Sequence, residues 1–317
     1  MRTAFFDALM QLAERDSRVF LVVGDLGFGV TEPFAERFPD RYLNAGVAEQ
    51  NMTGVAAGMA LSGKIVFTYS IANFPILRCL EQIRNDVCYH RANVKVVAVG
   101  GGFAYGSLGA THHATEDLAI MRALPAMSVV APGDPYEAAA ATEAVAAHDG
   151  PCYLRLGRAG EQTVHTRPIH FQLGKAIEVR QGGDLTMIST GGMLQTAVET
   201  ADALSRKGLQ ARVLSMHTLK PLDTDAVLTA ARETSAIFTL EEHSVIGGLG
   251  SAVAETLAES GEREVVFKRF ALPSVFACKS GTQEYLRAQF GLGTDSLSSA
   301  IYAAARERRQ FAVSASV

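Results

Sequence analysis

The stretch Tyr42-Leu43-Asn44-Ala45-Gly46-Val47-Ala48-Glu49-Gln50-Asn51-Met52-Thr53-Gly54-Val55-Ala56-Ala57-Gly58 decides how the chain is interpreted. A short strand over residues 42–44 enters a turn at Gly46, and a helix of small residues begins at Glu49. An acidic residue in the first turn of a helix interacts favourably with the helix dipole, so Glu49 can be a simple helix-start charge. The alternative is a functional carboxyl group. Its neighbours are mainly Gly, Ala, Val and Met, and apolar surroundings raise the pKa of a carboxyl group, as proton exchange near neutrality requires.

The composition predicts a soluble protein of about two domains. With 317 residues the chain is long for one domain, and 48% hydrophobic residues are enough for substantial cores. A net charge of −4 gives no reason to expect nucleic acid or an anionic membrane as a partner. No apolar run approaches the ~20 residues that a membrane span needs, and the first residues are not typical of a signal peptide, so we expect a cytoplasmic protein. The cysteines are widely spaced without a metal-binding pattern, which is typical of buried thiols in a reducing compartment: Cys79, Cys88, Cys152 and Cys278.

Apolar runs typical of buried strands alternate with helical patterns along the chain. This alternation predicts parallel sheets covered on both faces by helices. The periodicity is lost between residues 159 and 183, where Pro and Gly occur as in a linker. We therefore expect an α/β protein with two doubly wound, mainly parallel-sheet domains at residues 1–165 and 184–317, joined by a linker at 166–183. The expected strands are 19–24, 65–70, 94–100, 128–131, 152–157, 185–190, 211–216, 236–241 and 265–270, and the expected helices include 74–89, 116–124, 135–148, 194–207 and 250–258.

Polar residues gather at the carboxyl ends of the predicted strands of the first domain. In an open α/β sheet ligands bind at this edge, although the fold alone names no reaction. The residues that fall there are Asp25, residues 44–49 and 70–73, the loop 100–113 and residues 155–158. We therefore expect a functional site at this edge of the first sheet.

The loop at residues 100–113 has five glycines in its first ten residues and ends in two adjacent histidines, His112 and His113. It lacks the spacing of a phosphate-binding loop or of a dinucleotide-binding turn. Long Gly-rich loops inside compact domains are often functional. The histidines can be surface or capping residues, or one of them can face the cleft and take part in proton transfer or substrate binding.

Two arginines near the end of the last strand of the first domain, Arg155 and Arg158, can present a guanidinium group to a phosphate or carboxylate. A surface or interface ion pair is the alternative, and the sequence does not decide which arginine faces a substrate. A second Gly-rich turn, at residues 241–251, is interpreted as structural, because a strand-to-helix turn needs close backbone packing.

Five short segments spread over the chain match together the pattern of a known enzyme family. They are Gly46-Val47-Ala48-Glu49-Gln50-Asn51, Gly109-Ala110-Thr111-His112, Gly133-Asp134-Pro135, Thr218-Leu219-Lys220-Pro221-Leu222-Asp223, and Glu241-Glu242-His243 with Gly247-Gly248. The chain resembles the C-terminal half of a transketolase, that is, the pyrimidine-binding domain followed by the C-terminal domain. The resemblance covers nearly the whole chain. It is similar in plan to bacterial split transketolases, in which this half is a separate subunit.

The resemblance implies a thiamine diphosphate enzyme. The glutamate that matches Glu49 hydrogen-bonds the pyrimidine N1′ of the cofactor and favours the imino tautomer, whose nitrogen removes the proton from the thiazolium carbon. Phe74 matches an aromatic residue that packs on the pyrimidine ring, and Ile71 stands where the family pattern has a preceding aromatic residue. Asp25 matches an acidic residue near the thiazolium ring.

The resemblance also implies a sugar substrate. His112 matches a histidine that hydrogen-bonds the donor sugar, and Arg158 matches an arginine that binds the substrate phosphate. Transketolases that act on ordinary sugar phosphates carry an aspartate four residues before that histidine, where this chain has Leu108, and a further histidine where it has Gly100. Sites built to hydrogen-bond hydroxyl groups select differently from apolar ones, so we expect a modified, shorter or less hydroxylated sugar or keto substrate.

The signature with which thiamine enzymes hold the diphosphate and Mg²⁺, G-D-G with a downstream Asn, does not occur in this sequence. Mg²⁺ favours carboxylates and phosphate oxygens, and we assign no metal ligand to this chain. We expect a partner subunit, the N-terminal half of a transketolase, to hold the diphosphate and Mg²⁺, with active sites at the interface of an α2β2 assembly. The small residues of the helix beginning at Glu49 would allow close packing at such an interface or within the chain.

Three other functions are open to the same sequence. A deoxyxylulose-phosphate-synthase-like condensation and the β subunit of a 2-oxoacid dehydrogenase use the same cofactor, but V-A-E-Q at Glu49 is not usual for the dehydrogenase. A non-catalytic partner subunit would keep the fold, and the presence of Glu49 and His112 argues against it. The sequence favours the C-terminal subunit of a split transketolase, transferring a two-carbon ketol unit from a ketose to an aldehyde.

Overall fold

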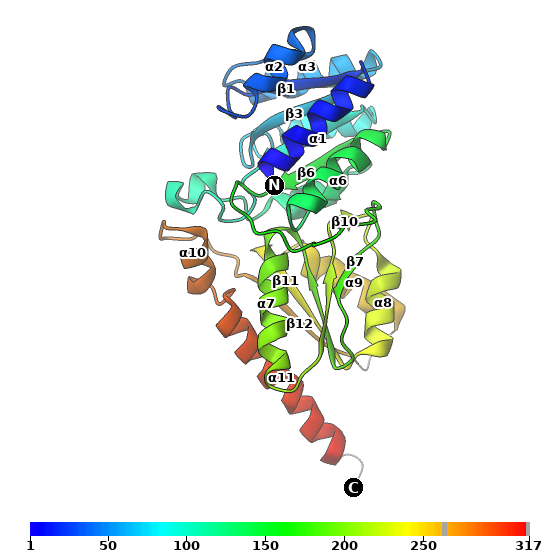
Figure 1. Ribbon diagram of the computed structural model, residues 1–317, viewed down its shortest axis with the longest axis vertical. Helices are drawn as coiled ribbons and strands as arrows, with labels where there is room; N and C mark the ends of the chain where they lie inside the picture. Colours follow the sequence, from blue (N-terminus) through cyan, green and yellow to red (C-terminus); the bar gives the residue numbers. More distant parts are fainter. Residues whose placement is uncertain (262–264, 315–317) are drawn as a thin grey trace.

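The computed structural model describes residues 1–261 and 265–314, and the chain folds into two α/β lobes that lie end to end (Figure 1). The N-terminal lobe contains a seven-stranded sheet with the order β10-β5-β6-β4-β3-β1-β2, and the C-terminal lobe a five-stranded sheet with the order β12-β11-β8-β9-β7. Neighbouring strands are parallel except for β10 with β5 and β7 with β9. The expectation of an α/β protein with two mainly parallel sheets is confirmed.

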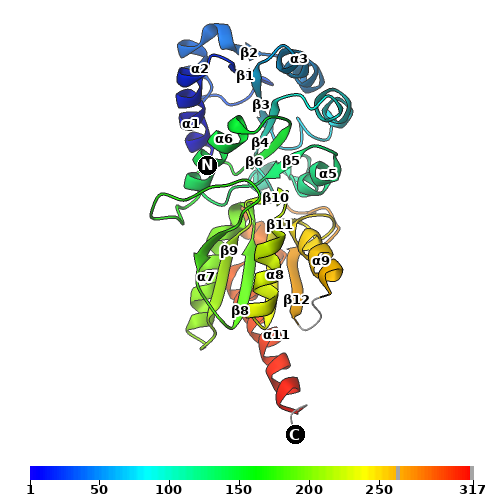
Figure 2. The same ribbon diagram turned by 90° about the vertical axis from the view of Figure 1, so that its right-hand side faces the viewer.

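The central strands of the N-terminal lobe are buried apolar runs, and helices cover both faces of the sheet (Figure 2). The strands are β1 (Val19–Val23), β2 (Tyr42–Asn44), β3 (Ile65–Ile71), β4 (Val94–Val99), β5 (Ser128–Val130) and β6 (Cys152–Leu156). The helices are α1 (Arg2–Arg15), α2 (Glu32–Arg37), α3 (Glu49–Leu61), α4 (Leu80–Gln82), α5 (Asp117–Ala123) and α6 (Pro135–Ala147), with short helical turns η1 (Pro39–Arg41), η2 (Ile83–Tyr89), η3 (Gly106–Leu108) and η4 (Ala110–His112).

The C-terminal lobe places α7 and α11 together on one side of its sheet, and α8 and α9 on the other (Figure 1). Its part of the chain contributes the strands β7 (Ile177–Arg180), β8 (Leu185–Ser189), β9 (Ala211–Ser215), β10 (Thr218–Lys220), β11 (Ala236–Ser244) and β12 (Val266–Leu272). The helices are η5 (Gly191–Met193), α7 (Leu194–Ser205), α8 (Thr224–Glu233), α9 (Leu249–Ser260), α10 (Gln283–Gln289) and α11 (Thr294–Ser314).

The helix expected over residues 74–89 begins later than predicted. Residues 72–79 form turns, and regular helix starts at α4 and continues as the π-helix η2. Pro75 has no backbone N–H to contribute to a helical ladder, and the chain closes in short turns instead, with Phe74 N bonded to Ile71 O at 2.9 Å. These turns keep Phe74 close to the carboxyl end of β3.

Two short strands were not predicted. Strand β7 lies inside the stretch 166–183, which was expected to be a linker, and it pairs with β9 at the edge of the second sheet. Strand β10 belongs to the second half of the chain but pairs with β5 of the first sheet. Both are edge strands of three or four residues, too short to show a period of alternation in the sequence.

Cys79, Cys88 and Cys152 are buried as expected, but Cys278 is exposed. It lies in an irregular segment between β12 and α10, where no strand or helix carries it into a core. In the described part of the chain, no helix has both the length and the apolar character needed to cross a membrane.

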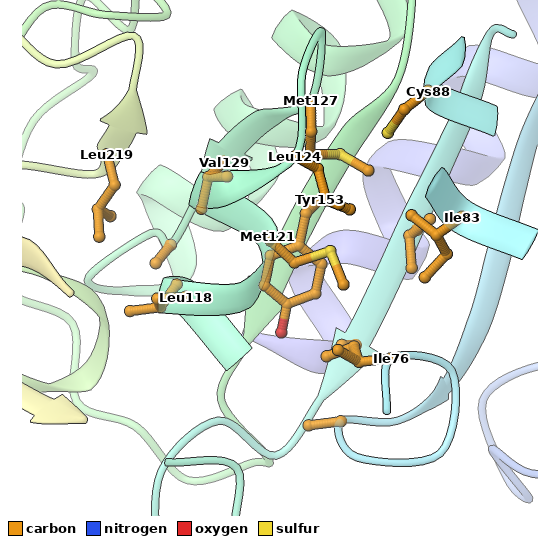
Figure 3. Close-up of a cluster of buried hydrophobic side chains, with 14 of the residues drawn as sticks. Ile76, Ile83, Cys88, Leu118, Met121, Leu124, Met127, Val129, Tyr153 and Leu219 are labelled. Carbon is orange, nitrogen blue, oxygen red and sulfur yellow. The ribbon is translucent and has the colours of Figure 1, made fainter. Parts of the chain in front are cut away.

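The two lobes share a hydrophobic core. Side chains of β9 and β10 join a buried cluster that also contains residues of β5, β6 and α5. Figure 3 shows Val129 and Tyr153 of the N-terminal lobe with Leu219 of β10 at the side of the cluster. A backbone hydrogen bond of 2.7 Å from Ala131 N to His217 O continues the connection. The lobes are therefore packed against each other as one unit at this edge.

A buried polar cluster lies at the same junction. His217 is fully buried, with its ring centroid 3.9 Å from that of Phe171 and its Nδ1 atom 2.9 Å from Thr218 Oγ1. Glu137 Oε1 is 2.8 Å from His165 Nε2 in the same cluster. Burial lowers the pKa of His217 to about 4, so this ring is neutral in the folded protein at neutral pH.

Replacing His217 by Phe should reduce the pH dependence of stability, because the variant keeps the aromatic stacking but cannot titrate. The folded-state pKa of about 4 lies below the ordinary value of 6.5. The unfolded state therefore binds more protons between these pH values, and the wild type loses stability as the pH falls through this window, by at most about 1.4 kcal/mol per pH unit. Glu137, His165 and Asp223 also face this ring. These groups are present in both proteins, so the measured quantity is the difference in urea unfolding free energy between wild type and variant across the window. Equal acid-induced losses in the two proteins would contradict the expectation.

Candidate active site

Glu49 lies where the connections of the first sheet reverse direction. Strand β1 has β2 on one side and β3 on the other, and such a switch point, at the carboxyl ends of parallel strands, is where open α/β sheets bind ligands. Helix α3 begins at Glu49, and the side chain is fully buried. A Cβ atom at Gly24, after β1, would lie 3.3 Å from Glu49 Cγ and 3.5 Å from Ser70 Oγ of β3. The glutamate therefore covers the ends of both strands.

The two carboxyl oxygens of Glu49 have different environments. Oε2 accepts a hydrogen bond of 2.8 Å from Arg78 Nη1, whereas Oε1 is buried and has no partner among the described residues. The expectation of apolar surroundings for Glu49 is therefore incomplete, because it did not include Arg78. This arginine is the one charged residue between positions 65 and 80, and its isolation is the signal that could have identified it.

Phe74 connects the glutamate to the histidine loop. The guanidinium carbon of Arg78 lies 5.6 Å from the centre of the half-buried Phe74 ring, and the His112 ring meets Phe74 edge-on with 5.3 Å between centroids. Ile71 ends β3, and its carbonyl group accepts the hydrogen bond from Phe74 N. The structure thus brings four of the predicted residues together: Glu49, Ile71, Phe74 and His112.

Asp25 lies at the same edge and is held by Asn44, at the end of β2. Asn44 Nδ2 donates to Asp25 Oδ1 at 2.9 Å, and Asn44 Oδ1 accepts from Asp25 N at 3.1 Å and from Gly46 N at 2.9 Å. Gly46 has φ +70°, a left-handed conformation that glycine adopts without strain. One side chain therefore ties the predicted acid to the turn that precedes Glu49.

The two adjacent histidines have different environments. His113 is buried, with Nε2 3.2 Å from Gly106 O and its ring edge-on to Phe103 at 5.0 Å. His112 is half-buried and faces Phe74. Asn73, just after β3, donates hydrogen bonds to backbone carbonyl groups of the same turn and so fastens the loop to the strand end. His113 is thus a packing residue of the loop, and His112 is the histidine that lies beside the other predicted site residues.

The two arginines at the end of β6 also differ. Arg155 is buried, with Nε 2.7 Å from Asp117 Oδ2 and Nη2 2.7 Å from Ala114 O. It therefore forms an ion pair within the chain, the alternative to ligand binding that the sequence left open. Arg158 is exposed, with its guanidinium carbon 5.3 Å from the centre of the Tyr105 ring. Of the two, Arg158 is the one that solvent, and therefore an anionic ligand, can reach.

The two departures from the family pattern lie on the same loop. Leu108 is 53% exposed on η3 and presents an apolar side chain to solvent. Gly100 has φ +95°, and a Cβ atom there would overlap the ring of Tyr105. The space that a histidine at position 100 would need is therefore taken by a tyrosine ring.

The open groups of this edge fit a planar heterocycle with a ring nitrogen. The unpartnered Oε1 of Glu49 needs a hydrogen-bonding partner, because a buried polar atom without one is costly. The half-buried ring of Phe74 offers an aromatic surface beside it. Within residues 1–261 and 265–314, no three His, Cys, Asp or Glu side chains are arranged to hold a metal ion.

Comparison with known families identifies both lobes. Residues 1–160 match the transketolase pyrimidine binding domain, and residues 174–297 match the transketolase C-terminal domain. The chain belongs to the transketolase family.

Transketolase relatives of similar length include two bacterial proteins and one solved structure. An apulose-4-phosphate transketolase subunit of Phocaeicola vulgatus is 42% identical over 261 residues, covering 82% of this chain and 84% of that protein. The 6-deoxy-6-sulfo-D-fructose transketolase subunit SqwH of Clostridium sp. (strain MSTE9) is 40% identical over 293 residues, covering 92% of this chain and 90% of that protein. A structure described as a split gene transketolase, inactive beta4 tetramer, is 39% identical with a TM-score of 0.89, covering 96% of this chain and 98% of that chain.

Replacing Arg78 by Met should destabilise this transketolase-family chain, because it leaves the buried Glu49 carboxylate without its donor. Arg78 is about half exposed and partly screened by solvent, so we expect a loss of about 1 kcal/mol in unfolding free energy. Urea denaturation of the two single variants and the double variant Glu49→Gln, Arg78→Met should give a coupling energy of about the same size. Arg84→Met, which removes an exposed arginine bonded to Asn85, is the control and should have little effect. Additive effects of the two site substitutions would show that the ion pair contributes nothing.

Proposed function

We propose that this chain is the C-terminal subunit of a split, thiamine-diphosphate-dependent transketolase, which transfers a two-carbon ketol unit from a ketose donor to an aldehyde acceptor. Membership of the transketolase family and the similar lengths of the relatives support this proposal. The observation that carries it is the buried Oε1 atom of Glu49, which has no partner among the described residues and lies at the switch point of the first sheet. A non-catalytic subunit would have no use for such an unsatisfied carboxyl group.

The side chains around Glu49 suit the cofactor that the family implies. When bound, thiamine diphosphate supplies an acidic thiazolium carbon that can attack a carbonyl group. Glu49 Oε1 would hold the pyrimidine ring through a hydrogen bond to its N1′ atom, and the hydrogen bond from Arg78 fixes the orientation of the carboxyl group. Phe74 and Ile71 would provide apolar surface for the pyrimidine ring and keep water away from the Glu49 carboxyl group. Asp25 would face the thiazolium ring, as the family pattern implies.

In this proposal the loop at residues 100–113 and the nearby Arg158 bind the substrate and determine which substrate is selected. His112 donates a hydrogen bond to an oxygen of the donor, and Arg158 binds an anionic group at the far end of the substrate. Leu108 and the absence of a side chain at Gly100 remove two polar contacts, so a modified or less hydroxylated substrate is favoured. The names of the two relatives refer to a sugar phosphate and a sulfonated sugar, both anionic, which supports a role for Arg158.

A partner subunit that supplies the diphosphate and Mg²⁺ sites is part of the proposal. Three exposed apolar side chains lie in the segments that follow β1 and lead into α3: Phe28, Leu43 and Val47. On α3, Gly54 and Gly58 face open space, whereas the alanines between and after them are buried, so one side of this helix is free for close packing. The relative described as a beta4 tetramer is also described as inactive, which supports the need for a second kind of subunit. We propose an α2β2 assembly in the cytoplasm.

Isothermal titration of the isolated chain with thiamine diphosphate and Mg²⁺ should show no binding at micromolar concentrations. The physical reason is that this chain offers contacts to one end of the cofactor, while the charged diphosphate lacks its Mg²⁺ ligands. Addition of the proposed N-terminal-half subunit should produce saturable binding. Micromolar binding by the isolated chain would contradict the proposed division between subunits.

Replacing Glu49 by Gln in the reconstituted pair should slow proton exchange at the thiazolium carbon by at least about 100-fold, because an amide cannot exchange a proton with the pyrimidine nitrogen. The measurement is hydrogen–deuterium exchange at that carbon followed by NMR. Glu81→Gln, an exposed residue of the neighbouring α4, is the control and should leave exchange unchanged. Normal exchange in Glu49→Gln would remove Glu49 from this role.

A further inference from the structure

The base of the loop that carries His112 is closed by a pair of backbone hydrogen bonds. Gly102 N donates to Ala114 O at 2.8 Å, and Ala114 N donates to Gly102 O at 3.0 Å. Residues 103–113 project beyond this pair. The orientation of His112 relative to Phe74 therefore depends on how the two ends of the loop are held.

The C-terminal lobe holds both ends of this loop through the end of β11. Glu242 Oε1 accepts a hydrogen bond of 2.9 Å from Phe103 N, the first backbone donor inside the loop. Arg155 Nη2 joins Ala114 O at 2.7 Å to the backbone carbonyl of Glu242 at 3.1 Å. Just beyond, Ser244 N donates to Thr115 O at 2.7 Å. Both ends of the loop are thus bonded to one strand of the other lobe.

The second carboxyl oxygen of Glu242 extends the connection to α10. Oε2 accepts hydrogen bonds from Gln283 Nε2 at 2.8 Å and from Arg287 Nη2 at 2.6 Å. The same region of the C-terminal lobe meets the loop again, with Phe290 stacked on Phe103 at 5.6 Å between centroids. In Figure 1, α10 lies directly beside the loop of the N-terminal lobe. Glu242, 3% exposed, therefore joins the loop to a helix that also supports it.

Glu242 lies at the switch point of the second sheet, at the carboxyl ends of its parallel strands, which is where open α/β sheets usually bind a ligand. Strand β8 has β9 on one side and β11 on the other, so the switch point of this sheet lies between the carboxyl ends of β8 and β11. The loop of the N-terminal lobe reaches this place, and Gly102 approaches so closely that a Cβ atom there would lie 2.6 Å from Glu242 Cδ. The binding edge of the second sheet thus receives a segment of the protein itself.

We propose that Glu242 is a positioning residue for the loop at residues 103–113. Through Glu242 the C-terminal lobe fixes the position of His112 and limits its mobility. The catalytic part of this inference rests on the proposed function, whereas its structural part does not. A carboxylate is needed because it accepts from Phe103 N on one oxygen and from two side chains on the other. The amide of a glutamine has one acceptor atom, so it must leave either the loop or α10 without a partner.

Hydrogen–deuterium exchange of the chain tests the structural part without substrate or cofactor. In Glu242→Gln the amides of residues 103–113 should exchange about tenfold faster than in the wild type, because one buried hydrogen bond is lost at the base of the loop. Glu241→Gln is the matched control. Glu241 is the adjacent buried residue of β11, and its oxygens accept from Leu249 N at 2.7 Å and Gly250 N at 2.8 Å at the start of α9. That control should loosen α9 and leave the loop protected.

A second variant covers the case in which Glu242→Gln does not fold. Gln283→Ala leaves β11 unchanged and removes one donor to Glu242 from α10. It should give the same loop-specific exchange at a smaller amplitude. Unchanged loop protection in the folded variants, or an equal increase throughout both lobes, would overturn the positioning role.

Kinetics of the reconstituted pair test the consequence for the substrate, with β-hydroxypyruvate as the probe donor and glycolaldehyde as the acceptor. Glu242→Gln should raise KM for the donor about tenfold, as expected for a displaced hydrogen bond to substrate, while thiazolium proton exchange stays within about twofold of the wild type. An unchanged KM, or a parallel loss of proton exchange, would contradict the inference. Absence of proton exchange in the wild-type pair would instead refute the proposed function, and the exchange experiment on the loop would still decide the structural part.

Discussion

The burial of one carboxylate, that of Glu49, constrains the rest of the first lobe. A fully buried carboxyl group is costly unless each of its oxygens finds a partner, and only Oε2 finds one among the described residues, in Arg78. Several local features make this burial possible. Gly24 has no side chain where the glutamate crosses the end of β1, and Gly46 provides the left-handed turn that lets α3 begin at position 49. The site is thus built around a group that the described chain leaves half satisfied.

Much of the first sheet and part of the site could be predicted from the sequence, because the decisive signals are local. The strands are continuous apolar runs, and Glu49 follows a turn and begins a helix, so both its position and its unusual surroundings are visible in a short window. The contact between Glu49 and Arg78 depends on turns after β3, where a helix was expected. The isolation of Arg78 in an apolar stretch marks the residue, but it does not identify Glu49 as its partner. The same reason explains why β7 and β10 were not predicted, since short edge strands are defined by their neighbours in space.

The difference between like residues could not be found in the sequence either. His112 and His113 are adjacent residues of the same type, so the sequence cannot distinguish them. In the structure the His112 ring packs against Phe74, whereas the His113 ring packs against Phe103. The roles of Glu241 and Glu242 divide in the same way, because alternate residues of a strand point to opposite faces. One supports α9 and the other supports the loop of the first lobe. Sequence can place such pairs at a strand end, but the partner of each member is set by elements that are distant in the chain.

Three successive glycines show how close packing, within the first lobe and between the lobes, shapes the sequence of the loop. Gly100, Gly101 and Gly102 do not have the spacing of a phosphate-binding loop, and each of them accommodates a different side chain of the protein. A Cβ atom at Gly100 would overlap the Tyr105 ring, one at Gly101 would lie 2.5 Å from Arg155 Nε, and one at Gly102 would lie 2.6 Å from Glu242 Cδ. Two of these three residues, Arg155 and Glu242, are joined by a hydrogen bond between the lobes, from the Arg155 side chain to the backbone carbonyl of Glu242. Close approach of the two lobes therefore explains Gly102, whereas Gly100 and Gly101 make room for side chains of the first lobe. The contact at Gly102 ties the loop that carries His112 to the second lobe.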